Sequence, residues 1–197
     1  NHKSVELLRL MAGLSITWIT LKDLRIDTII EETGTTIHEN AILKAEGYAR
    51  LTRMYPLADD SGLTVNALNG RPGVHSSRYG GPNMSSKQQR ELMLNELHGV
   101  SWSKRQAQFR CTLVLASPDR ADLKIASGIC QGLITISDRG TGGFGYDPIF
   151  YVPHQSCTMA EMNSGTKDRL GHRGKATFKM KSQIASLISD KQYTETK

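Results

Sequence analysis

Hydrophobic residues recur along the chain at spacings that alternate between those of helices and those of strands. Near the start, the apolar positions of residues 7–11 follow helical spacing, and Gly13 is expected to end that helix. The β-branched and aromatic residues 16–20 predict a strand. A second helix is predicted over residues 36–52, because its first residue and Glu39 have the Thr-x-x-Glu pattern of a capping box.

The middle of the chain predicts one helix and three strands. A short strand at residues 57–58 runs into an acidic segment, and a helix with a polar, basic start covers residues 85–97. Residues 106–115 and 123–136 predict two longer strands. The polar segment 117–122 between them has the composition of a hairpin turn.

The last third predicts a loop over residues 138–148, a strand over 149–152 and a basic amphipathic helix over 175–188. The chain has no internal repeat and no low-complexity linker, so a single domain over residues 1–197 is expected. Helices and strands alternate and a run of strands intervenes. This order predicts an α/β protein with a mixed sheet and flanking helices.

Composition narrows the class of protein. The hydrophobic fraction is 38%, and no run approaches the ~18 apolar residues that cross a bilayer. No secretory signal opens the chain, so no membrane partner is expected. The cysteines Cys111, Cys130 and Cys157 are isolated and lack the spacing of a metal site. A reducing, cytoplasmic location is the simplest interpretation.

The formal net charge of +6 favours anionic partners. The basic residues are spread along the chain, except over the last thirty residues, and no basic ribbon with interleaved aromatics is present. A localised phosphate site is therefore expected rather than a nucleic-acid partner. A basic nucleic-acid-binding module without catalysis is the alternative from a different class of function.

The segment Asp59-Asp60-Ser61-Gly62 follows a short apolar strand. Consecutive side chains of an extended strand point to opposite faces, so one carboxylate can bind a metal or a water while the other has a different partner. Gly62 permits a sharp turn or a close approach to a ligand. The alternative is an ordinary turn at the end of a strand.

Two further features suggest a phosphate and metal site. Glu31 and Glu32 lie in a loop before the capped helix, and with Asp60 they could form the oxygen-rich site that Mg²⁺ prefers. Lys44 shares the apolar face of the capped helix with Ala41, so it must extend its ammonium to solvent or meet an anion. The alternatives are a solvated acidic loop and an ordinary surface lysine.

Residues 140–148 combine four glycines with two aromatics and an aspartate. Such a backbone can wrap closely around a flat ligand, and Phe144 and Tyr146 offer faces on which a base can stack. Asp147 offers acceptors for a ring N–H or an amino group of a purine. The alternative is a mobile surface loop.

Lys167 is followed five residues later by His172 and Arg173. These side chains supply hydrogen-bond donors, and the 6-oxo group that distinguishes inosine and xanthosine from adenosine is an acceptor. The segment therefore predicts selectivity for 6-oxo purines. The alternative is a helix N-terminus with incidental basic residues.

Together these residues resemble the inosine triphosphate/xanthosine triphosphate pyrophosphatase family, the dITP/XTP diphosphatases, whose members remove deaminated purine nucleotides. The resemblance extends over essentially the whole chain, and the glycine-aromatic loop is its most specific part. The matching segments are Glu31-Glu32-Thr33-Gly34, Glu39-Asn40-Ala41 with Lys44, Ala58-Asp59-Asp60-Ser61-Gly62, Pro72-Gly73-Val74-His75-Ser76-Ser77-Arg78-Tyr79, Gly142-Gly143-Phe144-Gly145-Tyr146-Asp147-Pro148 and His172-Arg173-Gly174.

The resemblance implies an elongated, two-lobed α/β fold with its active site in the cleft between the lobes. It also implies a homodimer that uses Mg²⁺ and hydrolyses ITP, dITP and XTP to the monophosphate and pyrophosphate. A related pyrophosphatase acting on modified pyrimidine nucleotides is the nearer alternative.

The resemblance assigns roles residue by residue. Asp60 is implied to be the general base and a metal ligand, with Glu31, slightly preferred over Glu32, as the second ligand. Ser61 is implied to contact substrate. The triphosphate is implied to bind Lys3 and Lys44. The implied base pocket consists of Phe144, Gly145, Tyr146, Asp147, Lys167, His172 and Arg173.

The start of the chain departs from the family pattern. The family opens with a strand and a phosphate-binding loop, in which a Thr or Ser and an Asn precede the lysine that matches Lys3. Only Asn1 and His2 precede Lys3 here, and neither is at the position of the family's asparagine. An N-terminal strand is therefore expected to be missing, and triphosphate binding by this chain is expected to be weakened.

Overall fold

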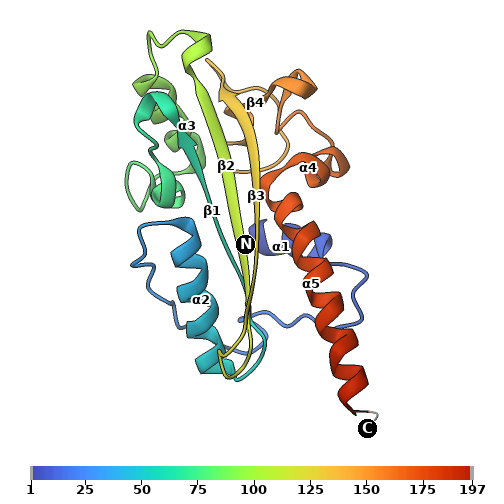
Figure 1. The fold of residues 1–197 in the computed structure, drawn as a ribbon. Coiled ribbons are helices and arrows are strands. Elements are labelled where there is room, and N and C mark those ends of the chain that lie inside the picture. Colours follow the sequence, from blue (N-terminus) through green and yellow to red (C-terminus); the bar gives the residue numbers. More distant parts are fainter. Residues whose placement is uncertain (1, 196–197) are drawn as a thin grey trace. The chain divides into compact units, whose positions relative to one another are not determined.

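A computed structural model describes residues 2–195 and contains a five-stranded sheet (Figure 1). The strands are adjacent in chain order, β1-β2-β3-β4-β5, and β4 pairs antiparallel with both β3 and β5. The expected α/β class with flanking helices is confirmed. The strands are β1 (Leu57–Val65), β2 (Gln106–Ala116), β3 (Leu123–Ile134), β4 (Phe150–Val152) and β5 (Cys157–Thr158).

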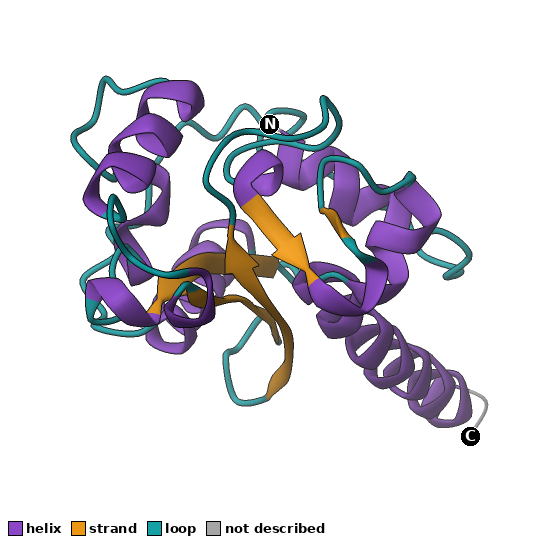
Figure 2. Ribbon diagram, turned by 90° about the horizontal axis from the view of Figure 1, so that it is seen from above, coloured by secondary structure: helices purple, strands orange, loops and turns teal. Residues whose placement is uncertain are grey.

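The helices (Figure 2) follow the predicted pattern in part. The helix expected over residues 175–188 begins three residues earlier, and a short helix precedes it that the hydrophobic pattern did not predict. That helix begins where the Asn163 side chain accepts a hydrogen bond from the backbone N–H of Thr166. The helices are α1 (His2–Leu10), α2 (Ile37–Thr52), α3 (Ser86–Glu96), α4 (Ser164–Leu170) and α5 (His172–Glu195).

The chain divides into two compact units. The first unit comprises Asn1–Asp60, Thr112–Ser127 and Ala176–Lys197, and the second comprises Ser61–Cys111 and Gly128–Lys175. One boundary falls at the peptide bond between Asp60 and Ser61, inside β1. The acidic motif therefore contributes residues to both units.

In the first unit, α2 packs through small side chains. The predicted capping box is present: the Thr36 side chain accepts from the backbone N–H of Glu39, and the Glu39 carboxylate accepts from the backbone N–H of Thr36. The alanines of one face, including Ala41 and Ala45, are fully buried and pack with Val114 of β2. Alanines let the helix approach the sheet closely, and this fixes the position of Lys44 on the same helix.

The strand predicted over residues 16–20 is not present. This segment is irregular and leads into a turn, where the Asp23 carboxylate accepts hydrogen bonds from the Thr20 backbone N–H and hydroxyl at 2.9 and 2.6 Å. Such local side-chain bonds compete with strand pairing. Ile16 and Ile19 are exposed, so these side chains gain no apolar burial that would favour a strand over the turn.

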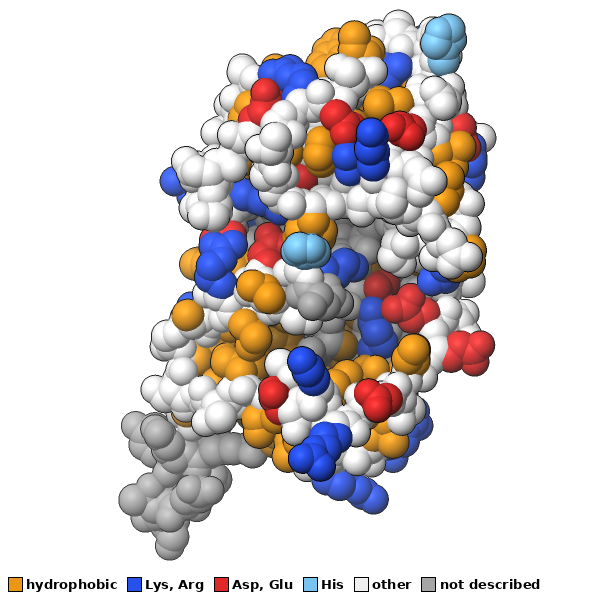
Figure 3. All heavy atoms as spheres, turned by 180° about the vertical axis from the view of Figure 1, so that it is seen from behind, with side chains coloured by type: hydrophobic (Ala, Val, Ile, Leu, Met, Phe, Trp, Pro, Cys, Tyr) orange, Lys and Arg blue, Asp and Glu red, His pale blue; other side chains and the backbone are white. Residues whose placement is uncertain are grey.

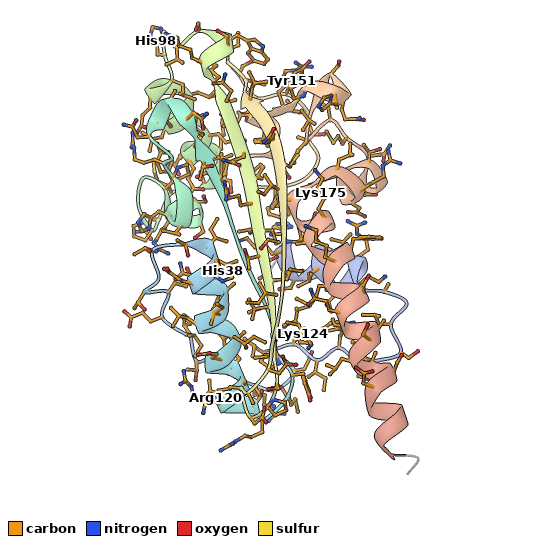
Figure 4. All side chains as sticks on the ribbon, viewed as in Figure 1. His38, His98, Arg120, Lys124, Tyr151 and Lys175 are labelled. Atoms are coloured by element: carbon orange, nitrogen blue, oxygen red, sulfur yellow. The ribbon has the colours of Figure 1, made fainter. Side chains whose placement is uncertain are left out.

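The hairpin between β2 and β3 is formed as predicted. The backbone N–H of Ser117 donates to the carbonyl of Asp122 at 2.9 Å, and Arg120 lies at the tip of the turn (Figure 4). Arg120 has a left-handed φ of 63°. The Thr112 and Ser127 hydroxyls lie 3.1 Å apart across the two strands.

Side chains of α5 donate to alternate carbonyls of β3. Within the second unit, Lys175 Nζ donates to the carbonyl of Ile129 at 2.9 Å (Figure 4). Within the first unit, Lys179 Nζ donates to the carbonyl of Ser127 at 2.8 Å and Gln183 donates to that of Ile125 at 3.1 Å. These donors cover backbone groups that could otherwise pair with another chain.

The second unit has the larger apolar core. Its centre contains Leu63 and Phe150, and α3 contributes Met93. Beside it, the Arg105 guanidinium is only 4% exposed and donates to the carbonyls of Leu97, Val100 and Thr135 at 2.7, 3.0 and 2.8 Å. Arg105 thus joins the end of α3 to the end of β3.

Candidate active site

The acidic motif lies inside β1, not at the end of a strand as predicted. Burial alternates along it: Asp60 is buried, whereas Asp59 and Ser61 are only partly covered. The expectation that the two carboxylates point to opposite faces is confirmed. Asp60 therefore extends toward the interior of the first unit, where α2 and the loop before it meet the strand.

Lys44 binds three acceptors in the first unit. Its Nζ atom lies 2.8 Å from Asp60 Oδ1, 2.9 Å from Glu32 Oε1 and 2.8 Å from the carbonyl oxygen of Asp59. An ammonium has three N–H donors, so these acceptors match its capacity. The Lys44 ammonium therefore meets anionic groups and does not extend to solvent as an ordinary surface lysine would. We name Glu32, Lys44 and Asp60 the carboxylate–lysine cluster.

Burial and the neighbouring charges together set the pKa values of Asp60 and Lys44. Burial raises the pKa of Asp60, and although the positive charge of Lys44 opposes this rise, the nearby charge of Glu32 adds to it. The charge of Lys3, on α1, also acts to lower the pKa of Asp60. Burial acts to lower the pKa of Lys44, but the carboxylates of Asp60 and Glu32 outweigh it and raise that pKa.

The loop before α2 favours Glu32 over Glu31 at this cluster. Glu32 contacts Lys44, whereas Glu31 is exposed, so the geometry does not support the preference for Glu31. The loop is held by α2: the fully buried Asn40 accepts from the backbone N–H of Gly34 at 2.8 Å. A Cβ at Gly34 would lie 2.7 Å from the Asn40 side-chain oxygen, so this close approach requires glycine.

The carboxylate–lysine cluster fits a magnesium ion on the chemistry of its donors. Mg²⁺ prefers carboxylate oxygens and takes only one or two of them, with substrate phosphates and waters as its other ligands. Glu32 and Asp60 provide two carboxylates on one ammonium. Over the described residues, no group of three or more His, Cys, Asp or Glu side chains could hold a metal by itself.

The glycine-aromatic loop forms a second cluster in the second unit. The Asp147 carboxylate is buried and accepts from the backbone N–H of Phe144 at 2.8 Å and from Lys167 Nζ at 2.7 Å. Lys167 Nζ lies 4.7 Å from the centroid of the Phe144 ring, and Arg173 Cζ lies 5.8 Å from it. A Cβ at Gly143 would collide with the Asp147 carboxylate, which explains the glycine there. We name Phe144, Asp147, Lys167 and Arg173 the aromatic–cation cluster.

The start of α5 joins this cluster to the acidic strand. The Arg173 guanidinium is 2% exposed and donates to the Ser61 hydroxyl at 2.9 Å. The His172 ring is buried and stacks on Phe109, with centroids 4.6 Å apart and planes 14° apart. The structure therefore brings Ser61, Phe144, Asp147, Lys167 and Arg173 together, and the last four are among the residues that the resemblance implied for the base pocket.

Tyr146 lies apart from the other loop side chains. It belongs to the apolar core of the second unit, and its hydroxyl donates to the carbonyl of Ser76 at 2.8 Å. Burial raises its pKa above the ordinary tyrosine value. This position does not favour a role in base stacking; Tyr146 anchors the loop. Gly145, with a left-handed φ of 61°, connects it to Phe144.

Sequence reasoning missed Arg90, an α3 residue. Its guanidinium pairs with Asp138 and donates from Nη1 to the carbonyl oxygen of Gly145 at 2.9 Å. Arg90 and Gly145 are 55 positions apart, and the polar sequence of α3 gives no local signal of the contact.

Each cluster, taken by itself, contains groups that suit a particular kind of ligand. Buried cations beside carboxylates suit a metal-bound polyphosphate, and an aromatic face with cations beside it suits a base. On the face shown in Figure 3, basic and acidic side chains are interspersed and form no continuous basic stripe. These features define an α/β protein of the nucleotide-binding class.

Comparison with known proteins gives the family. The model of the Ham1 family matches residues 1–183, and the chain belongs to this family. A dITP/XTP pyrophosphatase of Geobacter sulfurreducens is 43% identical over 91% of this chain and 89% of its own length. One of Halalkalibacterium halodurans is 49% identical over 73% of this chain and 74% of its own length.

Solved structures agree with this assignment. A HAM1 protein from Coxiella burnetii superposes with a TM-score of 0.86 at 39% identity, covering 93% of each chain. The Ham1 protein of Staphylococcus aureus superposes with a TM-score of 0.85 at 38% identity, covering 94% of this chain and 95% of that one. The fold of the family is thus shared over nearly the whole length.

Proposed function

We propose that this chain hydrolyses deaminated purine nucleoside triphosphates, namely ITP, dITP and XTP, to the nucleoside monophosphate and pyrophosphate. It is an enzyme of the nucleoside triphosphate pyrophosphatase class and removes these nucleotides from the nucleotide pool. Support comes from its membership of the Ham1 family and from relatives named dITP/XTP pyrophosphatase that are 43–49% identical to it.

The observation that carries the proposal is the pairing of Asp60 with Lys44 in the first unit. Burial raises the pKa of the Asp60 carboxylate, which makes it a stronger base than a solvated aspartate. The ammonium beside it keeps a positive charge where phosphate oxygens can bind. The Asp60 carboxylate can accept a proton, and the Lys44 ammonium can attract the phosphate.

Four residues provide the chemistry in this proposal. Asp60 takes the proton of the water that attacks the α-phosphorus, and the bond from that phosphorus to the bridging oxygen of the β-phosphate breaks. Lys44 and Lys3 bind the phosphates electrostatically. Glu32 and Asp60 would hold Mg²⁺, which when bound supplies positive charge to the leaving pyrophosphate.

The aromatic–cation cluster accounts for selectivity in this proposal. The Phe144 ring is partly exposed and provides a stacking face, while Arg173 and Lys167 place donors beside it. A 6-oxo purine accepts hydrogen bonds from such donors, whereas the 6-amino group of adenine leaves them unsatisfied. His172 stacks on Phe109 and supports the neighbouring Arg173.

We also propose that the protein works in the cytoplasm as a homodimer, as the family resemblance implies. No helix within residues 2–195 combines the length and the apolarity that a membrane span requires. Size-exclusion chromatography with light scattering would give the mass in solution. A monomeric mass at micromolar concentration would refute the dimer.

The testing experiment measures pyrophosphate release with Mg²⁺ at slightly alkaline pH. The substrates are the triphosphates of inosine, xanthosine, guanosine, adenosine and thymidine. Strong preference for the first two is the expected result. Preference for thymidine triphosphate would instead favour a pyrophosphatase acting on pyrimidines, and orthophosphate release in place of pyrophosphate would refute cleavage between the α- and β-phosphates.

A further inference from the structure

Arg90 of α3 binds two points of the segment that contains the glycine-aromatic loop. Its Nε atom lies 3.0 and 2.9 Å from the two carboxylate oxygens of Asp138, and Nη2 also donates to this carboxylate at 2.6 Å. Its Nη1 atom donates to the carbonyl oxygen of Gly145 at 2.9 Å. One guanidinium thus binds Asp138, before the loop, and Gly145, next to the Phe144 ring.

Burial makes this contact stronger than an ordinary surface ion pair. The Arg90 side chain is 13% exposed, although Asp138 is 42% exposed. Hydrogen bonds to ionised groups are about twice as strong as neutral ones, and the planar fork of arginine loses less side-chain freedom per bond than lysine does. The contact therefore restrains the Gly145 carbonyl.

The restraint acts where the loop has most backbone freedom. Gly143 and Gly145 both have left-handed φ angles, of 70° and 61°. Inside the loop, Phe144 is held by two hydrogen bonds with Asp147: its N–H donates to the carboxylate, and its carbonyl accepts from the Asp147 N–H. Arg90 adds a bond from another element, so the direction of the Phe144 ring depends on α3 as well as on the loop.

We propose that Arg90 is a positioning residue for base recognition: by holding Asp138 and Gly145 it fixes the Phe144 face against which the purine stacks. It acts through Asp138 and Gly145, so it is a positioning residue and not a catalytic one. This inference rests on the proposed function, because it assigns Arg90 a part in the selectivity of that same site.

Arg90→Ala, Arg90→Lys and the control Lys87→Ala test the proposal. Lys87 lies on α3 and its side chain is 77% exposed, with only a long contact to Glu91. Lys87→Ala removes one positive charge from the same helix, as Arg90→Ala does, but it leaves the contact between Arg90 and the loop in place. Arg90→Lys keeps the charge but lacks the fork that binds both points, and it provides the test if Arg90→Ala does not fold.

The first measurement is hydrogen exchange of the backbone amides of residues 140–147 without nucleotide. We expect faster exchange in both Arg90 variants than in the wild type and Lys87→Ala. The second is steady-state kinetics with ITP and ATP. We expect the KM for ITP to rise about tenfold in Arg90→Ala, with kcat within about twofold and a lower preference for ITP over ATP.

Two results would overturn the proposal: exchange equal to that of Lys87→Ala, or faster exchange with unchanged KM and unchanged ITP preference. The second would make the contact purely structural. Failure of the proposed function is a separate outcome, because the wild type would then release no pyrophosphate from ITP. In that case base positioning by Arg90 would be refuted. The hydrogen exchange of residues 140–147 would still show whether Arg90 restrains the loop.

Discussion

Lys44 Nζ and Asp60 Oδ1 lie 2.8 Å apart, and the same ammonium binds Glu32 and the carbonyl of Asp59. The lysine therefore holds a buried carboxylate that burial alone would drive toward the neutral form. Removing the lysine leaves two neighbouring acids without their cation. The chemistry expected of Asp60 depends on this contact, and so do the predictions about it.

Asp60→Asn is expected to lower kcat for ITP by at least about a hundredfold, because the amide cannot accept the proton of the attacking water. The amide oxygen of the substituted side chain can still accept from Lys44, so nucleotide binding should change much less than turnover. Calorimetric titration with a non-hydrolysable ITP analogue measures the affinity. If affinity fell in proportion to the rate, Asp60 would be a binding group and not the base.

Glu32→Gln is expected to raise the Mg²⁺ concentration that gives half-maximal activity by about tenfold or more. Glu31→Gln is the matched control, since it removes the same charge from the adjacent, exposed position. The measurement is activity against Mg²⁺ concentration at saturating ITP. The opposite ranking of the two variants would restore the sequence-based preference for Glu31.

Features set by local sequence were predictable. The capping box of Thr36 and Glu39 requires only residues three apart, and the opposite orientation of Asp59 and Asp60 follows from the period of a strand. The turn at residues 117–122 also forms from its own polar residues. These features needed no knowledge of tertiary contacts.

Features set by distant contacts were not predictable. The choice between Glu31 and Glu32 depends on which one the loop turns toward Lys44, and hydrophobic periodicity does not contain this information. The loop sequence predicts Tyr146 to be a stacking residue. In the structure its ring lies in the core of the second unit, and its hydroxyl donates to the carbonyl of Ser76. The apolar pattern of residues 16–20 lacks a strand partner, so the local turn prevails.

Arg105→Met is expected to lower the free energy of unfolding by roughly 3 kcal/mol, because three buried carbonyls would lose their donor. Arg110→Met is the control, since Arg110 is exposed on β2, the strand that begins directly after Arg105, and such surface substitutions usually change stability by less than about 0.5 kcal/mol. Urea unfolding followed by fluorescence gives both values. Equal losses in the two variants would show that the buried hydrogen bonds contribute little.

Tyr79 is expected to make stability fall in alkaline solution. Burial, and after it the hydrogen bond that its hydroxyl donates to Glu96 at 2.7 Å, together raise its pKa to about 12, although the charge of Arg71 opposes the rise. A pKa raised by folding means that the folded state holds the proton more tightly than the unfolded state. The contribution to stability is therefore complete below the ordinary value of 10 and is lost as pH rises toward about 12.

Tyr79→Phe tests this sign. At pH 8 the variant should be less stable than the wild type, because the bond to Glu96 is lost, and the difference should shrink as pH rises from 10 to about 12. Denaturant unfolding at several pH values measures the difference, and the absorbance of tyrosinate reports the ionisation directly. Tyr55→Phe, at a 37% exposed position, is the control. A stability difference that stayed constant across this range would mean that Tyr79 ionises equally in the folded and unfolded states.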